Sequence, residues 1–86
     1  MDDAALDERL RALAHPVRRR LLAACRDAPQ PAGALVELTG LAPASVSEHL
    51  KVLRKTGLVV LEARGRFRLY TTVPEAINET AQELLI

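Results

Sequence analysis

The chain has 86 residues, of which 49% are hydrophobic, and a formal net charge of +1. This length suits one domain over residues 1–86 and excludes a second. The single cysteine excludes an intramolecular disulfide, and with it a disulfide-stapled secreted scaffold. The start of the chain resembles no signal peptide, and no apolar run approaches the roughly 20 residues of a membrane span, so we expect a cytoplasmic protein without a membrane partner.

Two amphipathic helices are expected at the start of the chain. Three leucines spaced at i, i+4 and i+7 predict a helix over residues 3–14. Pro16 disfavours a helical conformation at His15 but suits the first turn of a second helix, which we expect to end near Asp27. The predicted apolar faces comprise Leu6, Leu10 and Leu13 in the first helix and Val17, Leu21, Leu22 and Cys25 in the second.

A helix-turn-helix follows the proline-containing loop at residues 28–31. We expect a short third helix over residues 32–39, capped by Gly40, and a fourth helix that Pro43 opens and Gly57 terminates. Two helices joined by a turn of about four residues form the helix-turn-helix outline. The side chains expected to be buried are Leu35 and Leu38 in the third helix and Val46, Leu50 and Leu53 in the fourth.

A β-hairpin and a last helix complete the chain. Residues 58–61 are rich in β-formers, residues 66–70 alternate with period two, and Gly65 lies between them. We expect Phe67 and Leu69 to face the core and the arginines to face outward. Pro74 then opens a last helix, whose apolar stripe comprises Ile77, Ala81, Leu84 and Leu85. The expected fold is mainly α with a small β-hairpin, in the order α-α-α-α-β-β-α.

Three stretches carry a resemblance to a known family: LAHPVR at residues 13–18, VSEHLKVL at residues 46–53, and Arg64-Gly65-Arg66 leading to Tyr70. In this order they resemble the ArsR-type winged helix-turn-helix transcriptional regulators. The resemblance implies a homodimeric, sequence-specific repressor that inserts its fourth helix into the major groove of double-stranded DNA and lays the hairpin along the backbone as a wing. The operator would be an imperfect inverted repeat. The implied dimer interface uses the first and last helices, through Leu6, Leu10, Leu13, Ile77, Ala81, Leu84 and Leu85.

The distribution of charge agrees with a DNA-binding middle segment. Residues 16–70 carry ten basic and four acidic side chains, a balance of +6, whereas residues 71–86 carry three acidic side chains and no basic one. Clustered cations supply salt-sensitive affinity for phosphate. The candidate backbone-contacting residues are Arg18, Lys51, Arg54, Lys55, Arg64, Arg66, Arg68 and Tyr70.

The start of the fourth helix carries the candidate base-contacting residues Ala44, Ser45, Ser47 and Glu48. A serine hydroxyl can donate to or accept from several bases, so it helps to position the helix more than it selects a particular base. Glu48 can accept from a cytosine amino group, but an acid at this place can instead repel phosphate.

Several roles stay open at the level of the sequence. Arg18, Arg19 and Arg20 begin the second helix, where the dipole disfavours cations, so we expect a phosphate contact or a pair with Asp7 or Glu8. His49, at the edge of the apolar stripe, is expected to be partly buried and bonded to a neighbouring backbone group rather than to a base. Tyr70 either caps the wing or contacts a phosphate.

No sensor or catalytic set is expected. Many members of the family release DNA on binding metal, through a Cys-x-Cys pair on the third helix or ligands on the last helix. Here the cysteine positions are Pro31 and Gly33, and residues 72–86 contain neither His nor Cys, so we expect no metal and no cofactor. Cys25, on an apolar stripe, is expected to be buried and unreactive. The competing function is a winged-helix module that binds an acidic protein; an enzyme is not suggested.

Overall fold

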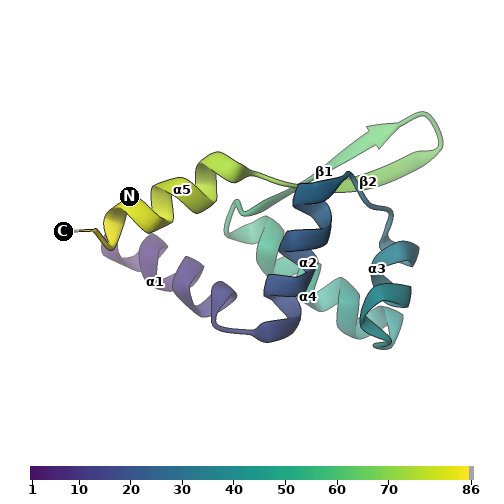
Figure 1. Cartoon of the computed structure of the whole chain (residues 1–86), viewed down its shortest axis with the longest axis horizontal. Helices are drawn as coiled ribbons and strands as arrows, with labels where there is room; N and C mark the ends of the chain where they lie inside the picture. Colours follow the sequence, from purple (N-terminus) through teal and green to yellow (C-terminus); the bar gives the residue numbers. More distant parts are fainter. Residues whose placement is uncertain (86) are drawn as a thin grey trace.

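The computed structural model describes residues 1–85 and contains five helices and one hairpin (Figure 1). The predicted fold class is confirmed. In chain order the elements are α1 (Asp3–Leu13), α2 (Pro16–Asp27), α3 (Ala32–Thr39), α4 (Pro43–Lys55), β1 (Val59–Arg64), β2 (Phe67–Thr72) and α5 (Pro74–Glu83).

Local signals explain where the helices begin and end. The Asp2 carboxylate accepts a hydrogen bond from the amide of Ala5 at 2.7 Å, which caps α1. The His15 ring accepts from the amide of Val17 at 3.2 Å, so the residue that interrupts the helical path also caps α2. Gly40, in the left-handed region with φ of 69°, ends α3 as expected. Prolines occupy the first turns of α2, α4 and α5, where a missing amide hydrogen costs nothing.

The core lies where α2, α3 and α4 meet the start of the hairpin, and it is aliphatic. The expected burial of the α4 stripe and of the α2 face is confirmed, although Val17 is only partly buried. The prediction that Leu38 is buried is wrong, because its side chain is 45% exposed. In this short helix the inward side comprises Leu35, which is buried, with Val36 and Thr39, which are partly buried. Leu38 lies on the side that faces solvent. The largest fully buried side chains are Leu21, Leu35, Leu50, Leu53, Leu58, Val46, Val59 and Cys25.

The hairpin faces are the reverse of those expected. Val59 pairs with Thr72 and Leu61 with Tyr70, so Tyr70 and Thr72 share the inner face with the buried Val59. Phe67, predicted to face the core, is 65% exposed. Alternation alone fixes two faces but does not say which one is inside. Which face lies inside depends on the hydrogen bonds that β2 makes with neighbouring elements.

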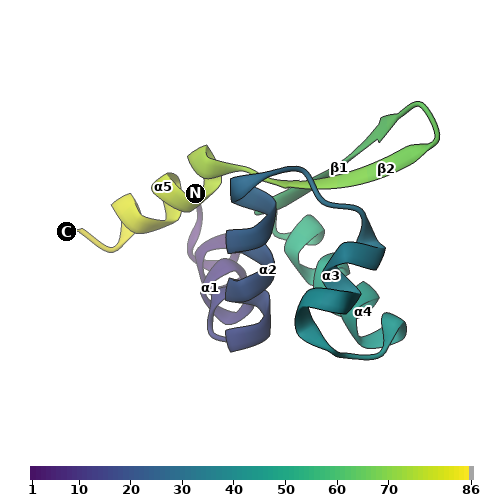
Figure 2. The ribbon, with the colours of Figure 1, turned by 45° about the vertical axis from the view of Figure 1, so that its right-hand side comes forward.

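Two contacts outside the hairpin fix that choice. Tyr70 and Gln30 exchange backbone hydrogen bonds of 2.8 and 2.9 Å, which joins the loop before α3 to β2. The buried Thr72 hydroxyl donates to the carbonyl of Leu22 at 2.7 Å, which joins β2 to α2. Beyond these anchors the hairpin extends away from the helices (Figure 2).

The helices nearest the two ends of the chain, α1 and α5, lie side by side at the end of the molecule away from the hairpin tip (Figure 1). This arrangement separates them from the helix-turn-helix formed by α3 and α4. Within residues 1–85, no helix is long and apolar enough to cross a membrane.

Candidate nucleic-acid interface

The helix α4 presents one apolar and one open polar face. Val46, Leu50 and Leu53 are buried against the core. The four candidate base-contacting residues at its start are all exposed: Ala44, Ser45, Ser47 and Glu48. The first turn has no side-chain cap, Pro43 has no amide hydrogen, and the amides of Ser45 and Val46 donate to the carbonyl of Ala42. The start of α4 therefore presents exposed, mostly small side chains to solvent.

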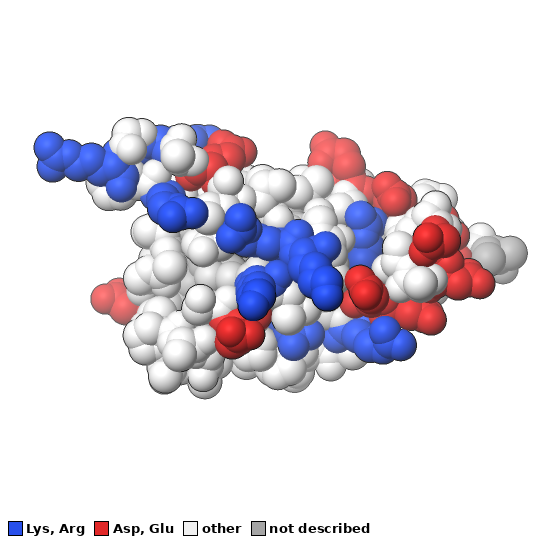
Figure 3. All heavy atoms as spheres, turned by 180° about the vertical axis from the view of Figure 1, so that it is seen from behind, with Lys and Arg blue, Asp and Glu red and all other residues white. Residues whose placement is uncertain are grey.

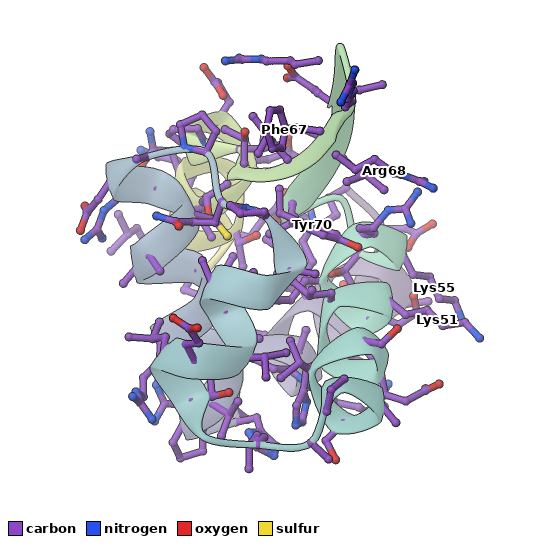
Figure 4. The ribbon with its side chains drawn as sticks, turned by 90° about the vertical axis from the view of Figure 1, so that its right-hand side faces the viewer. Lys51, Lys55, Phe67, Arg68 and Tyr70 are labelled. Atoms are coloured by element: carbon purple, nitrogen blue, oxygen red, sulfur yellow. The ribbon has the colours of Figure 1, made fainter. Side chains whose placement is uncertain are left out.

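A row of cations continues from α4 onto the hairpin. Lys51, Arg54 and Lys55 are exposed and line a hollow between the second half of α4 and the start of β1. Arg68 lies on the inner face of the hairpin and points to the same side of the molecule as Lys51 and Lys55 (Figure 4). The helix and the hairpin thus present their cations toward one common space.

The hairpin tip carries two more arginines. Gly65 has φ of 60° and Arg66 does not have a positive φ, which is the pattern of a type II′ turn with glycine at its first central position. Arg64 and Arg66 are both exposed, and Arg64 pairs with Glu62 at 3.4 Å. Such an exposed pair is weak and leaves the guanidinium able to exchange partners.

Tyr70 lies between the hairpin and the helix-turn-helix. Its side chain is half-buried, points toward α4 (Figure 4), and lines a groove between α3 and α4 with Val36, Ser47 and Leu50. The backbone bridge to Gln30 adds to this packing. Tyr70 therefore supports the base of the wing, while Phe67 points from the opposite face of the hairpin (Figure 4).

Arg18 contacts the middle of α4 through His49. Its Nε donates to His49 Nδ1 at 3.2 Å, and the His15 and His49 rings lie 4.5 Å apart. Burial, and then the nearby positive charge of His15 and Arg18, lowers the pKa of His49. His49 is partly buried as expected, but its partner is a side chain rather than a backbone group. These residues border a hollow beside Ala44, Ser45 and Glu48.

The arginine cluster at the start of α2 binds the ends of other helices. Arg19 donates to the carbonyl of Leu13 at 2.7 Å and Arg20 to that of Leu38 at 2.9 Å. These carbonyls belong to the last turns of α1 and α3, where the backbone carries partial negative charge. The expected alternative, a pair with Asp7 or Glu8, does not occur among residues 1–85.

Many acidic side chains lie away from the cationic row, although Glu48 and Glu62 lie on the same elements as the cations. Seen from behind, Lys and Arg side chains form a band from the hairpin across the middle of the molecule, and Asp and Glu gather at the end that holds the chain termini (Figure 3). The separation expected from the sequence is thus present on the surface.

The residues expected at a dimer interface lie on α1, on α5 and in the segment that follows α5. Leu6, Leu10, Leu13 and Ile77 are half-buried, and Ala81 is exposed. The helix α5 ends at Glu83, so Leu84 and Leu85 follow it, and they are 57% and 75% exposed. Leu84 and Leu85 are thus the exposed large apolar side chains of this set.

Arg9 is a structural residue that sequence reasoning missed. Its guanidinium contacts both the end of α4 and α5. The available signal was its spacing, because Arg9 lies on one helical face with Ala5 and the buried Ala12. A cation among small residues on an inward face needs carbonyl or carboxylate partners.

Cys25 offers no reactive thiol. The side chain is fully buried, and burial raises its pKa to about 11. The part of the chain that is described holds no group of three or more His, Cys, Asp or Glu side chains suited to a metal ion.

Comparisons with known proteins agree with this geometry. Residues 13–62 match the model of the family described as "Helix-turn-helix domain". The chain is 36% identical to the HTH-type transcriptional regulator NmtR of Mycobacterium tuberculosis over 88% of this chain and 63% of NmtR, so it spans less than two thirds of that relative. It is 38% identical to the HTH-type transcriptional regulator CmtR of the same species over 99% of this chain and 72% of CmtR. An ArsR-like transcriptional regulator from Rhodococcus sp. RHA1 superposes with a TM-score of 0.87 at 28% identity, over 94% of this chain and 76% of that structure.

Proposed function

The chain belongs to the ArsR-type winged helix-turn-helix transcriptional regulators, and from this membership we propose that it binds double-stranded DNA as a homodimer and represses transcription. The observation that carries the proposal is the cationic row, in which the exposed Lys51 and Lys55 of α4 and the exposed Arg68 of the hairpin point to the same side of the molecule. A phosphate backbone requires such repeated positive contacts.

In the proposed complex, α4 enters the major groove and its exposed start reads base edges. Ala44, Ser45, Ser47 and Glu48 are the proposed base contacts. The hairpin follows the backbone as a wing. The proposed backbone contacts are Arg18, Lys51, Arg54, Lys55, Arg64, Arg66, Arg68 and Tyr70.

Dimerisation is proposed through α1 and α5, with Leu6, Leu10, Leu13, Ile77, Ala81, Leu84 and Leu85 at the interface. Their exposed apolar surface supports this assignment. A two-fold dimer binds two half-sites about one helical turn apart, so the proposed operator is an imperfect inverted repeat.

We propose that the regulator works in the cytoplasm without a metal or another cofactor. The buried thiol of Cys25 supports the absence of a cysteine sensor. Regulators of this family are generally not enzymes, and we propose no catalytic activity for this chain.

The test is DNA binding across a salt series, with random duplex DNA and the promoter of the protein's own gene. We expect affinity to fall steeply with salt and the promoter to bind at least ~10³-fold tighter than random DNA. Replacing Arg64 and Arg66 together with alanine is expected to weaken DNA binding without changing dimerisation. Replacing Arg26 with alanine removes one positive charge from α2, where Arg26 pairs with the adjacent Asp27, and is the matched control for the single Arg66→Ala variant.

The same experiment discriminates the competing function. If the protein binds neither DNA even at low salt, the cationic row serves an acidic protein partner instead and the repressor assignment is wrong.

A further inference from the structure

Arg9 is an inward-facing basic residue at the junction of three helices. Its side chain is only 16% exposed, whereas the other charged residues of α1 are exposed. Burying a guanidinium is costly unless its donors find partners. Its partners lie at the end of α4, the proposed DNA-reading helix, and on α5, a proposed dimer helix.

The guanidinium of Arg9 joins the end of α4 to α5. Its Nε donates to the carbonyl of Thr56, the residue that ends α4, at 3.0 Å. Its Nη1 donates to the carbonyl of Ala76 at 3.2 Å and to the Thr80 hydroxyl at 3.3 Å, and lies 3.5 Å from Glu79 Oε1. No other side chain within residues 1–85 hydrogen-bonds to both α5 and the end of α4.

The geometry of arginine matters for this junction. A guanidinium is planar and carries its donors in a rigid fork, so acceptors bound on two sides are held at a fixed separation and angle. A lysine ammonium is a rotatable point charge and imposes no such angle. Arg9 thus holds the end of α4 against α1 and α5, and it also constrains the angle between α4 and these two helices.

The turn that follows α4 passes next to the same guanidinium. A Cβ on Gly57 would lie 3.4 Å from Arg9 Nη2, which is an ordinary van der Waals contact. Glycine is favoured here because φ is 76°, a backbone conformation that other residues rarely adopt.

We propose that Arg9 is a positioning residue that sets the half-site spacing accepted by the regulator. The inference rests on the proposed function, since it needs a dimer joined through α1 and α5 that reads DNA with two copies of α4. Adding one base pair between half-sites moves them apart by roughly 3.4 Å and rotates one by about 35° relative to the other. A dimer rejects this change only if each α4 is rigidly oriented relative to the dimer helices.

The experiment compares spacing preference in the wild type, Arg9→Met and Arg9→Lys. The probe is a duplex selected by the wild-type protein from a random-sequence library, with derivatives that carry one base pair more or fewer between half-sites, and a derivative with a single half-site. We expect the wild type to bind the altered spacings at least about 10-fold more weakly, a loss comparable to a base-pair mismatch. In Arg9→Met this ratio should fall below about 3-fold, while affinity for the single half-site stays within about 2-fold of wild type. Arg9→Lys should be intermediate.

Two controls separate this role from a general loss of stability or charge. Arg26→Met removes one guanidinium, which among residues 1–85 bonds to the adjacent Asp27, and should keep the wild-type spacing ratio. Sedimentation velocity and circular dichroism establish that each variant is folded and dimeric. Should Arg9→Met fail to fold, Arg9→Lys alone decides the question.

The outcomes distinguish the inference from the function on which it rests. Folded, dimeric Arg9 variants that keep the wild-type spacing ratio overturn the inference alone, as does an equal loss of affinity for single and paired half-sites. If the wild-type protein selects no duplex with paired half-sites, the proposed dimeric DNA binding itself is wrong and the inference fails with it.

Discussion

Individual arginines in this protein serve two purposes that their sequence positions do not distinguish. Arg66 and Arg68 are exposed on the hairpin, where they are available to phosphate. Arg9, Arg19 and Arg20 instead donate to carbonyls at or near the ends of α4, α1 and α3. Helix C-termini carry orphan carbonyls and partial negative charge, so guanidinium groups bind there and tie one helix to the next. Part of the basic charge of the chain is therefore structural.

At the same scale, His49 makes the stability of the protein sensitive to acid. Its folded-state pKa lies below the ordinary value of 6.5, so between these values the unfolded chain binds a proton that the folded chain does not. The free energy of unfolding should therefore fall as the pH drops below about 6.5. Protonation of Nδ1 also removes the acceptor for Arg18. His49→Gln should reduce this dependence, measured by urea unfolding at about pH 8 and about pH 5.5.

The exposed Asp7→Asn variant provides a control, because a change of one distant titrating group should leave the slope near pH 6 unchanged. An identical loss of stability in wild type and His49→Gln would assign the acid sensitivity to another group.

At the scale of elements, α4 is at once the centre of the core and the proposed reading helix. Its stripe of Val46, Leu50 and Leu53 is buried, and its opposite face is open. The hairpin is attached through the Gln30–Tyr70 bridge and Thr72, whereas its tip makes no comparable contact with the helices. We therefore expect a rigid reading helix beside a wing that is fixed at its base and free at its tip.

Leu50→Ala tests the contribution of α4 to the core. The side chain is 1% exposed, so its truncation leaves a cavity and should lower the free energy of unfolding by about 2–5 kcal/mol. Urea unfolding measures the change. The matched variant Ser47→Ala, on the exposed face of the same helix, should change stability by less than about 0.5 kcal/mol. Equal effects of the two substitutions would contradict the burial of the α4 stripe.

At the scale of the whole molecule, the chain separates a cationic surface from an apolar end. The cations follow α4 and the hairpin, and many acidic side chains gather at the end that holds the chain termini (Figure 3), where Leu84 and Leu85 are also exposed. This separation suits a protein that binds a polyanion with one surface and its own copy with another.

Leu84→Glu tests the apolar end. Because Leu84 is 57% exposed in the single chain, the substitution should leave the monomer folded. In a dimer it would bury a carboxylate without a partner, and we expect dimerisation to weaken by at least about 100-fold, or roughly 3 kcal/mol. Sedimentation equilibrium measures the dissociation constant. Glu75→Gln, outside the proposed interface, is the control, and an unchanged dimer in Leu84→Glu would place the interface elsewhere.

The sequence by itself determined the order of elements, the helix ends and the buried stripe of α4. These features depend on local signals: prolines at first turns, Gly40 and Gly57 at helix ends, and apolar residues at helical spacing. It also determined that basic and acidic residues occupy different segments, since charge is a property of residue type.

Only the tertiary structure decided which face of the hairpin is inside and which arginines hydrogen-bond to backbone carbonyls of other elements. Alternation is symmetric with respect to the two faces, and the bonds of β2 to Gln30 and Leu22 break that symmetry. The same holds for Arg9, whose acceptors lie 47 to 71 positions away along the chain. Acceptors so distant in sequence come together only when the helices pack, so no local pattern can reveal them.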